Sequence, residues 1–379
     1  MLVSAGTSAR RRAMREQAEQ LTTAVNWSRL AETLHARRLL PTLGPRVLEL
    51  ADGRASDSFV TMVKQAVDSG RRQGAFLQLI SMRVVAALAD AGIRSTVLKG
   101  PLLGEAIYGD PGRRPSGDID VLVAQEQLHA AVGVVRGLGY GAPADHVEHH
   151  GLPLLHFALV HERRELPPVE LHWRIHWYER SFAHDRLLPS VADPTGKWRP
   201  APVDEFCALL LFYARDGFID LRLATDLSAW WDAFGVELQS DMIRKLLRVY
   251  PALERVLTAA AKAAEMIVGL PAAHIIGHGS RLNRRGSMAV RLANPNPHAS
   301  QEQLYADMGL IDGLLMPPGG VGAFVRRQLM PPREILRERA RLAQERRARS
   351  PLGHSARVLG RYGLAMTRLA GAPEALRPT

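Results

Sequence analysis

Two aspartates, Asp118 and Asp120, stand one residue apart where the apolar run 119–123 begins. Side chains of a strand point alternately to its two faces, so both carboxylates would leave one face while the apolar residues enter a core on the other. Like charges this close repel unless a divalent cation lies between them, and hard oxygen ligands suit Mg²⁺ or Mn²⁺. The pair alone fits a polar strand edge or a turn equally well, so its chemistry depends on further ligands.

A third carboxylate, Glu170, lies in the run 168–177, where polar and apolar residues alternate strictly. The alternation predicts a half-buried strand with four polar residues on one face: Glu170, His172, Arg174 and His176. If this strand lies beside the one that carries the two aspartates, Glu170 completes a three-carboxylate site able to hold two metal ions for in-line phosphoryl or nucleotidyl transfer. His172 is then an orienting residue, a solvated residue or a ligand.

The residues before the aspartates could bind phosphate. A β-prone run at 95–98 is followed by Lys99 and Gly100, and 101–108 has the pattern of a helix with proline in its first turn. Free N–H groups at a helix N-terminus, the helix dipole and a nearby ammonium favour a triphosphate, and glycine permits a close approach to the backbone. Arg113 and Arg114 could clamp the same phosphates or the leaving pyrophosphate.

Three motifs carry a resemblance to a known family: VLKG at 97–100, YGDPGRRPSGDIDVLV at 108–123 and VELHW at 169–173. Together they resemble the signature of the bacterial uncharacterised nucleotidyltransferase family, a branch of the polymerase-β-like nucleotidyltransferase superfamily. Weaker likenesses at 26–30, 39–41, 221–227 and 329–336 extend the resemblance over most of the chain. Two residues depart from the pattern: Pro101 follows Gly100 where the wider superfamily has a Gly-Ser or Gly-Gly pair, and Arg215 stands where many relatives carry a histidine.

The resemblance implies an α+β protein with a polymerase-β-like nucleotidyltransferase core, a mixed sheet flanked by helices, and N- and C-terminal helical regions. It also implies a Mg²⁺-dependent or Mn²⁺-dependent enzyme that moves a nucleoside monophosphate from an NTP, with ATP as the expected substrate. Asp118, Asp120 and Glu170 are then the catalytic residues and the metal ligands. The candidate nucleotide-binding residues are Lys99, Gly100, Arg113, Arg114, Ser116, Gly117 and His172.

The expected mechanism is two-metal catalysis. One Mg²⁺ on Asp118 and Asp120 would carry the β- and γ-phosphates, and a second, bridged by these aspartates and Glu170, would activate an acceptor hydroxyl for in-line attack on the α-phosphorus. Lys99, the Gly100 backbone and Arg114 would neutralise the phosphates. The acceptor is open between a small molecule, a peptide or protein, and RNA. A phosphotransferase acting on a peptide or small molecule, or an inert binding protein with the same fold, are the alternatives.

Composition is that of a globular protein of two or three domains, with 46% hydrophobic and 23% charged residues in 379. The single cysteine, Cys207, lies in an apolar run, so we expect it to be a small core residue with a free thiol. A chain without a disulfide favours a cytoplasmic location. Apolar stretches are too short to cross a bilayer, so we expect no membrane partner. The sequence leaves the oligomeric state open.

Helical and strand patterns divide the chain into five regions. We expect an N-terminal helical region at 1–91, the catalytic core at 92–200, a helical domain at 201–270, a linker or mobile loop at 271–300 and a basic helical region at 301–379. From Arg326 onward there are thirteen arginines against four acidic residues, a major part of the net charge of +11. Residues 333–349 predict a charged helix, either solvated or forming a basic surface for an anionic substrate.

Five histidines gather between 146 and 161: His146, His149, His150, His156 and His161. Their spacing is irregular and no cysteine accompanies them. Such a pattern favours a polar loop over a structural zinc site.

Overall fold

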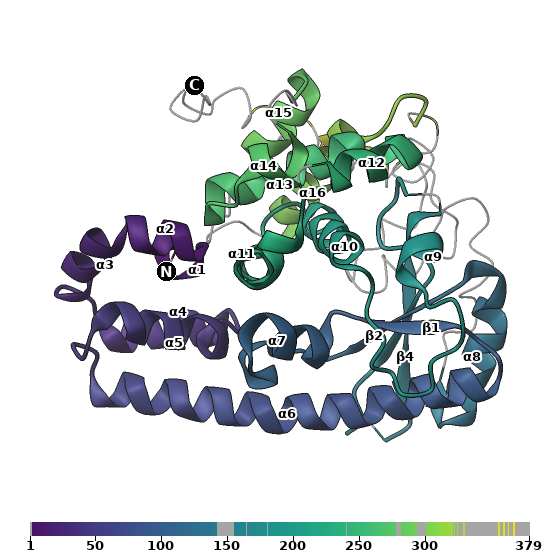
Figure 1. Ribbon diagram of the computed structural model, residues 1–379, viewed down its shortest axis with the longest axis horizontal. Helices are drawn as coiled ribbons and strands as arrows, with labels where there is room; N and C mark the ends of the chain where they lie inside the picture. Colours follow the sequence, from purple (N-terminus) through teal and green to yellow (C-terminus); the bar gives the residue numbers. More distant parts are fainter. Residues whose placement is uncertain are drawn as a thin grey trace.

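Helices flank a five-stranded mixed sheet in the computed structural model of the protein (Figure 1). The structure describes residues 2–141, 155–163, 165–179, 181–239, 241–277, 282–293 and 301–320, with isolated positions between 322 and 367. This arrangement confirms the predicted α+β class and is consistent with a nucleotidyltransferase-like core. None of the described helices is both long and apolar enough to span a bilayer.

The sheet has the strand order β1-β2-β5-β4-β3. Its strands are β1 Ser95–Leu98, β2 Ile119–Val123, β3 Tyr140–Gly141, β4 His156–His161 and β5 Val169–His172. β2 and β5 run parallel at the centre with Asp120 opposite Glu170, and the other neighbours pair antiparallel. The two strands that carry the predicted carboxylates are therefore direct neighbours.

The strand predicted at 168–177 is shorter than the alternation suggests, because β5 ends at His172. Beyond it the carboxylate of Glu179 accepts hydrogen bonds from the backbone N–H groups of Ile175 and Ala183, both at 2.9 Å. Glu179 is 1% exposed, and burial raises its pKa. These two hydrogen bonds connect the segment after β5 to the start of α9 (Phe182–Leu187).

One face of the sheet packs against two helices, α6 (Asp57–Asp90) and α8 (Leu128–Gly137). Its core residues are the odd-numbered members of β2 and β5: Ile119, Val121, Val123, Val169 and Leu171. α6 begins at the N-cap Ser56, whose hydroxyl accepts the N–H of Phe59, and its 34 residues correspond to about 50 Å. Figure 1 shows α6 running beneath both the N-terminal helices and the sheet.

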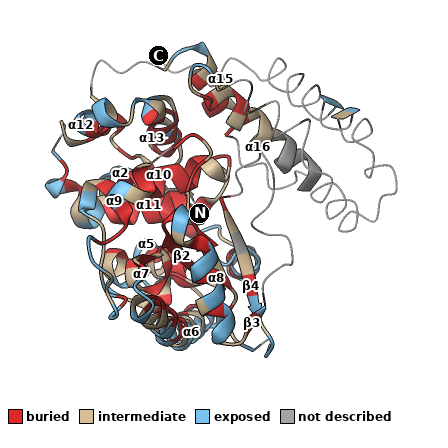
Figure 2. Cartoon of the chain, turned by 90° about the vertical axis from the view of Figure 1, so that its right-hand side faces the viewer, coloured by how far each residue is buried: buried red, intermediate tan, exposed pale blue. Residues whose placement is uncertain are grey.

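The opposite face, which carries Asp120 and Glu170, lies under the helical domain. Leu98 and Leu122 of this face join a large core with Phe212 and other residues of α10 (Pro202–Arg215). Figure 2 shows that α10 and α11 (Leu221–Phe234) are buried along much of their length. Between Phe206 and Ala214 the helix α10 is apolar and buried on all sides, which is typical of a central helix of a large domain.

The remaining helices complete the two helical regions. On the N-terminal side they are α1 Leu2–Ala5, α2 Ser8–Ala13, α3 Arg15–Thr22, α4 Trp27–Ala36, α5 Leu40–Ala51 and α7 Gly100–Tyr108. On the C-terminal side they are α12 Met242–Val249, α13 Glu254–Val268, α14 Ala272–Ile276, α15 Arg284–Leu292 and α16 Gln301–Leu315. Short 3-10 turns are η1 Pro111–Arg113, η2 Gln125–Gln127, η3 Gly235–Glu237 and η4 Pro251–Leu253.

The stretch predicted as a linker at 271–300 contains α14 and α15. Both helices bury apolar side chains, among them Ile275 and Val290, so the described part of this stretch belongs to the helical core. Glycines and asparagines suggested a loop there, but they lie mainly between and after the helices. The predicted helix at 333–349 and the histidines at 146, 149 and 150 lie outside the described residues.

Candidate functional site

The three predicted carboxylates meet at the centre of the sheet. Asp118 directly precedes β2, Asp120 lies in β2, and Glu170 lies opposite Asp120 in β5. Oxygen atoms of the three side chains lie within 4.8 Å of one another. The Ser116 hydroxyl donates a hydrogen bond to Asp118 Oδ1 at 3.0 Å, which orients that carboxylate. The geometry therefore offers a cluster of hard oxygen ligands able to hold a divalent cation.

Asp120 has two further partners. Lys99 Nζ lies 3.2 Å from its Oδ2, and His172 Nε2 lies 2.8 Å from its Oδ1. Burial alone would raise the pKa of this carboxyl, but the Lys99 ammonium and the His172 hydrogen bond favour the charged form and hold the pKa well below its usual range. Asp120 is consequently anionic at neutral pH although it is almost fully buried.

Lys99 and Gly100 form the junction between β1 and α7, as the sequence predicts. Lys99 has φ 58° and ψ −134°, and Gly100 has φ 71°. Positive φ is natural for glycine but strained for lysine, whose Cβ crowds the backbone. The strained conformation accompanies an ammonium placed against both Asp120 and the ring of Phe212, whose centroid is 4.1 Å from Nζ.

A comparison of two substitutions isolates this strain. We expect Lys99→Gly to be more stable than Lys99→Ala by about 1 kcal/mol. Glycine loses more backbone entropy on folding than alanine, but this cost is smaller than the strain that it removes. Both variants lose the same ammonium contacts, so each serves as the control for the other. Urea unfolding of the two proteins measures the difference. Equal stabilities, or a more stable alanine variant, would contradict a strained Lys99.

Arg113 and Arg114 have partners in the helical regions. Arg114 is 3% exposed, and its Nε donates to Asp226 Oδ2 at 2.9 Å, while the Tyr108 hydroxyl donates to Asp226 Oδ1 at 2.8 Å. The Arg113 guanidinium lies over the Tyr108 ring at 5.4 Å. A buried arginine already paired with a carboxylate is poorly placed to clamp phosphate. The contacts of Arg114 support the loop before β2, and the phosphate role expected for both arginines stays a prediction.

Two histidines complete the polar face. His156 opens β4 opposite His172, and their rings stack with centroids 4.5 Å apart. His156 Nε2 lies 3.3 Å from Glu170 Oε2. Burial and the neighbouring His172 lower the pKa of His156 to about 4, so this ring is neutral at pH 7. The polar loop predicted for the histidine-rich stretch is therefore wrong for His156 and His161, which begin and end a strand.

The sequence model of a family described as uncharacterised nucleotidyltransferase matches residues 23–267. The chain belongs to this family. Its membership supports a general nucleotidyltransferase function. No curated protein and no solved structure matches the chain. The matched region spans the described residues from α4 through almost all of α13, and it includes the three carboxylates.

Arg215, which the sequence analysis noted only as a departure, lies near Lys99 and Asp120. Its guanidinium lies 4.8 Å from the centroid of the Phe212 ring, the ring that Lys99 also contacts. Its Nε is 3.3 Å from Asp216, whereas its buried Nη1 has no hydrogen-bond partner among the described residues. The charge of Arg215 also lowers the pKa of Asp120. The sequence does not indicate that Arg215 lies near the carboxylates, because it follows an apolar run and is distant from the three central motifs.

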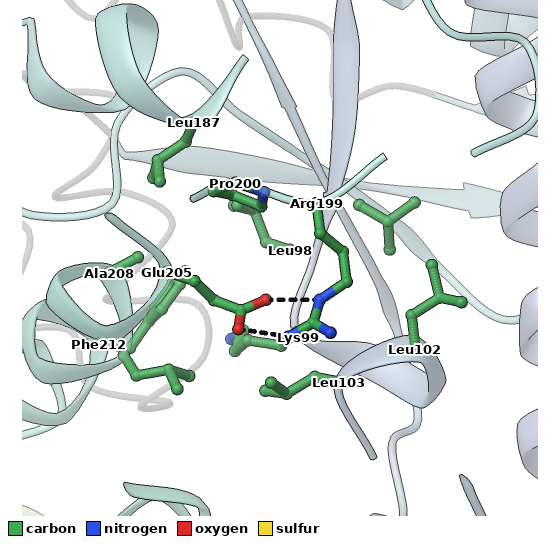
Figure 3. A pocket seen from close by; sticks show the side chains of 12 residues that line it. Leu98, Lys99, Leu102, Leu103, Leu187, Arg199, Pro200, Glu205, Ala208 and Phe212 are labelled. Atoms are coloured by element: carbon green, nitrogen blue, oxygen red, sulfur yellow. Dashed lines mark hydrogen bonds and ion pairs between the residues drawn. The ribbon is translucent and has the colours of Figure 1, made fainter. Parts of the chain in front are cut away.

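A pocket of the nucleotidyltransferase lies beside Lys99. It is small, with a cavity volume of about 30 Å³, partly open to solvent, and is lined mainly by apolar residues of β1, α7 and α10. Figure 3 shows Arg199 and Glu205 paired within it through hydrogen bonds of 3.0 and 2.5 Å. Lys99 and Phe212 line the pocket as well.

Proposed function

We propose that the protein is a metal-dependent nucleotidyltransferase that transfers a nucleoside monophosphate from an NTP, with ATP as the expected substrate, to a hydroxyl of an acceptor. The observation that carries the proposal is the convergence of Asp118, Asp120 and Glu170 within 4.8 Å on neighbouring strands. Lys99 at the β1–α7 junction supplies a cation beside this cluster. Family membership supports the same class of reaction.

The residues present fit a divalent cation such as Mg²⁺ or Mn²⁺. All three donors are carboxylate oxygens, and the pKa of both Asp120 and Glu170 is lowered, so both are ionised at neutral pH. Lys99 offsets part of the negative charge and so reduces repulsion within the cluster. A bound cation would polarise the phosphate and make an acceptor hydroxyl a better nucleophile.

The chain's own side chains would bind and orient the reactants. Lys99, at the strained β1–α7 junction, and Arg215, the last residue of α10, would neutralise the phosphates. The Gly100 backbone lies at the N-terminus of α7, where N–H groups and the helix dipole favour an anion. His172 holds Asp120 in position through its 2.8 Å contact.

An isotope experiment tests the proposed reaction. The purified protein, Mg²⁺ and candidate acceptors are incubated with ATP labelled at the α- or the γ-phosphorus, with Glu170→Gln as the inactive control. We expect the α label to enter the product and the γ label to leave as pyrophosphate. Entry of the γ label into the acceptor would instead establish a phosphotransferase and overturn the proposal.

The cations of the site provide a prediction about binding. Lys99→Ala and Arg215→Ala should each weaken Mg²⁺–NTP binding by about 1.5–3 kcal/mol, the usual value of a charge-assisted contact. Arg136→Ala, on the exposed face of α8, removes the same charge away from the site and should leave affinity unchanged. Calorimetric titration with each NTP measures the effect. Wild-type affinity in both site variants would refute their assignment to phosphate.

A further inference from the structure

A second group of potential metal ligands overlaps the carboxylate cluster. His156, Glu170 and His172 each place a ligand atom within 4.8 Å of the others. The Nε2 atoms of His156 and His172 lie 3.3 and 3.5 Å from Glu170 Oε2. Strong charge-assisted hydrogen bonds are shorter, at about 2.7–2.9 Å. Ligand atoms around a tetrahedral metal with bonds of about 2.0–2.1 Å are about 3.3–3.4 Å apart, and the two distances to Glu170 Oε2 match this spacing.

The two histidine rings share one arrangement: Nε2 has polar neighbours and Nδ1 has none among the described residues. His172 is fully buried and His156 is partly buried, and the Nδ1 atom of each is buried without a hydrogen-bond partner among the described residues. Both rings direct Nε2 toward Glu170 Oε2, and Nε2 of His172 also contacts Asp120 Oδ1, so Nε2 is the atom that each ring would offer to a metal.

We propose that His156, His172 and Glu170 form a nitrogen-rich cation site, selective for a transition metal such as Zn²⁺ and distinct in chemistry from the all-oxygen cluster. Imidazole nitrogen suits Zn²⁺ and related ions, whereas Mg²⁺ prefers oxygen. Asp120 Oδ1 lies 2.8 Å from His172 Nε2, a hydrogen-bond distance that has to lengthen by about 0.5 Å before both atoms can bind one tetrahedral metal. The rings belong to β4 and β5, so two hydrogen-bonded strands hold the donors in register.

Because Glu170 belongs to both groups, the two sites compete for it. A transition metal on the histidines withdraws Glu170, and through His172 also Asp120, from the oxygen cluster. This competition predicts that Zn²⁺ inhibits Mg²⁺-dependent transfer and that added Mg²⁺ relieves the inhibition, a prediction that rests on the proposed function. The nitrogen site itself can be tested without any nucleotide.

The test is a titration of the metal-free full chain with Zn²⁺, and with Co²⁺ as a coloured substitute, in the absence of NTP. Wild type should bind one Zn²⁺ more tightly than Mg²⁺ and give an intense visible Co²⁺ spectrum of tetrahedral type. His156→Gln should weaken Zn²⁺ binding at least about tenfold and lose that spectrum, while Mg²⁺ affinity stays within about twofold. His156 is partly exposed, so this variant is expected to fold, and circular dichroism verifies it.

His161→Gln is the matched control. His161 ends the same strand, and its ring contacts the Leu138 carbonyl and the Tyr140 ring, away from Glu170. It should keep wild-type Zn²⁺ affinity and the Co²⁺ spectrum. The proposal is overturned if His156→Gln binds Zn²⁺ as wild type does, or if His161→Gln loses as much affinity. Either result is independent of whether the protein transfers nucleotides.

Discussion

Asp118→Asn and Asp120→Asn should each lower the rate of nucleotidyl transfer by about 10³-fold or more, while only Asp120→Asn should destabilise the protein. The loss of activity follows from removing one charged oxygen ligand from a cluster of three within 4.8 Å. Single preorganised electrostatic groups at a reacting centre are worth about 10²–10³ in rate, and a metal ligand is expected to reach or exceed this value.

The stabilities should differ because the two carboxylates have different surroundings. Asp118 is partly exposed, and its carboxylate accepts a hydrogen bond from the neighbouring Ser116. Asp120 is buried and holds Lys99 and His172, so an amide there leaves the buried ammonium without its anionic partner. We expect a loss of about 1–3 kcal/mol for Asp120→Asn and less than about 0.5 kcal/mol for Asp118→Asn. Repulsion between the aspartates alone would predict that both variants gain stability.

Transfer assays and urea unfolding of the same two proteins separate these effects. Glu170→Gln, the third member of the cluster, should lose activity as the aspartate variants do. Mg²⁺-dependent transfer in either aspartate variant would refute the catalytic assignment. Equal stability of the two variants would leave the catalytic role intact and refute the structural role of Asp120.

The parts of the site that the sequence predicts are those with a local pattern. Alternation at 119–123 and around Glu170 gives the face to which each carboxylate points, because side-chain direction in a strand has a period of two. Glycine followed by proline after a β-prone run likewise predicts a helix at 101–108, and α7 begins one residue earlier, at Gly100. These features depend on a few consecutive residues, and the structure places them as expected.

The parts that the sequence missed depend on partners far apart in the chain. Arg114 pairs with Asp226, 112 residues later, and His172 meets Asp120 across 52 residues. His156 reaches Glu170 only because β4 pairs with β5. No period or motif encodes such pairs, and an arginine next to an expected phosphate site resembles a phosphate ligand until its buried carboxylate is known.

The largest loss of stability is expected from Asp226→Asn. Asp226 is fully buried and accepts hydrogen bonds from Tyr108 and from Arg114, which is 3% exposed. Removing its charge leaves a buried guanidinium uncompensated, which typically costs about 3–5 kcal/mol. Asp241→Asn is the matched control, because Asp241 pairs with Lys245 on an exposed helix face and its loss should cost less than about 0.5 kcal/mol. Urea or thermal unfolding measures both.

Arg114→Met decides between support and phosphate binding for this arginine. If Arg114 supports the loop before β2, Arg114→Met should lose stability because Asp226 becomes an unpaired buried charge. Combining it with Asp226→Asn should then cost less than the sum of the two single changes, since the double variant buries no lone charge. NTP affinity of the folded fraction should change little. Full additivity, or a loss of NTP affinity with unchanged stability, would return Arg114 to the phosphate site and place the cation that faces the substrate before β2 rather than on α10.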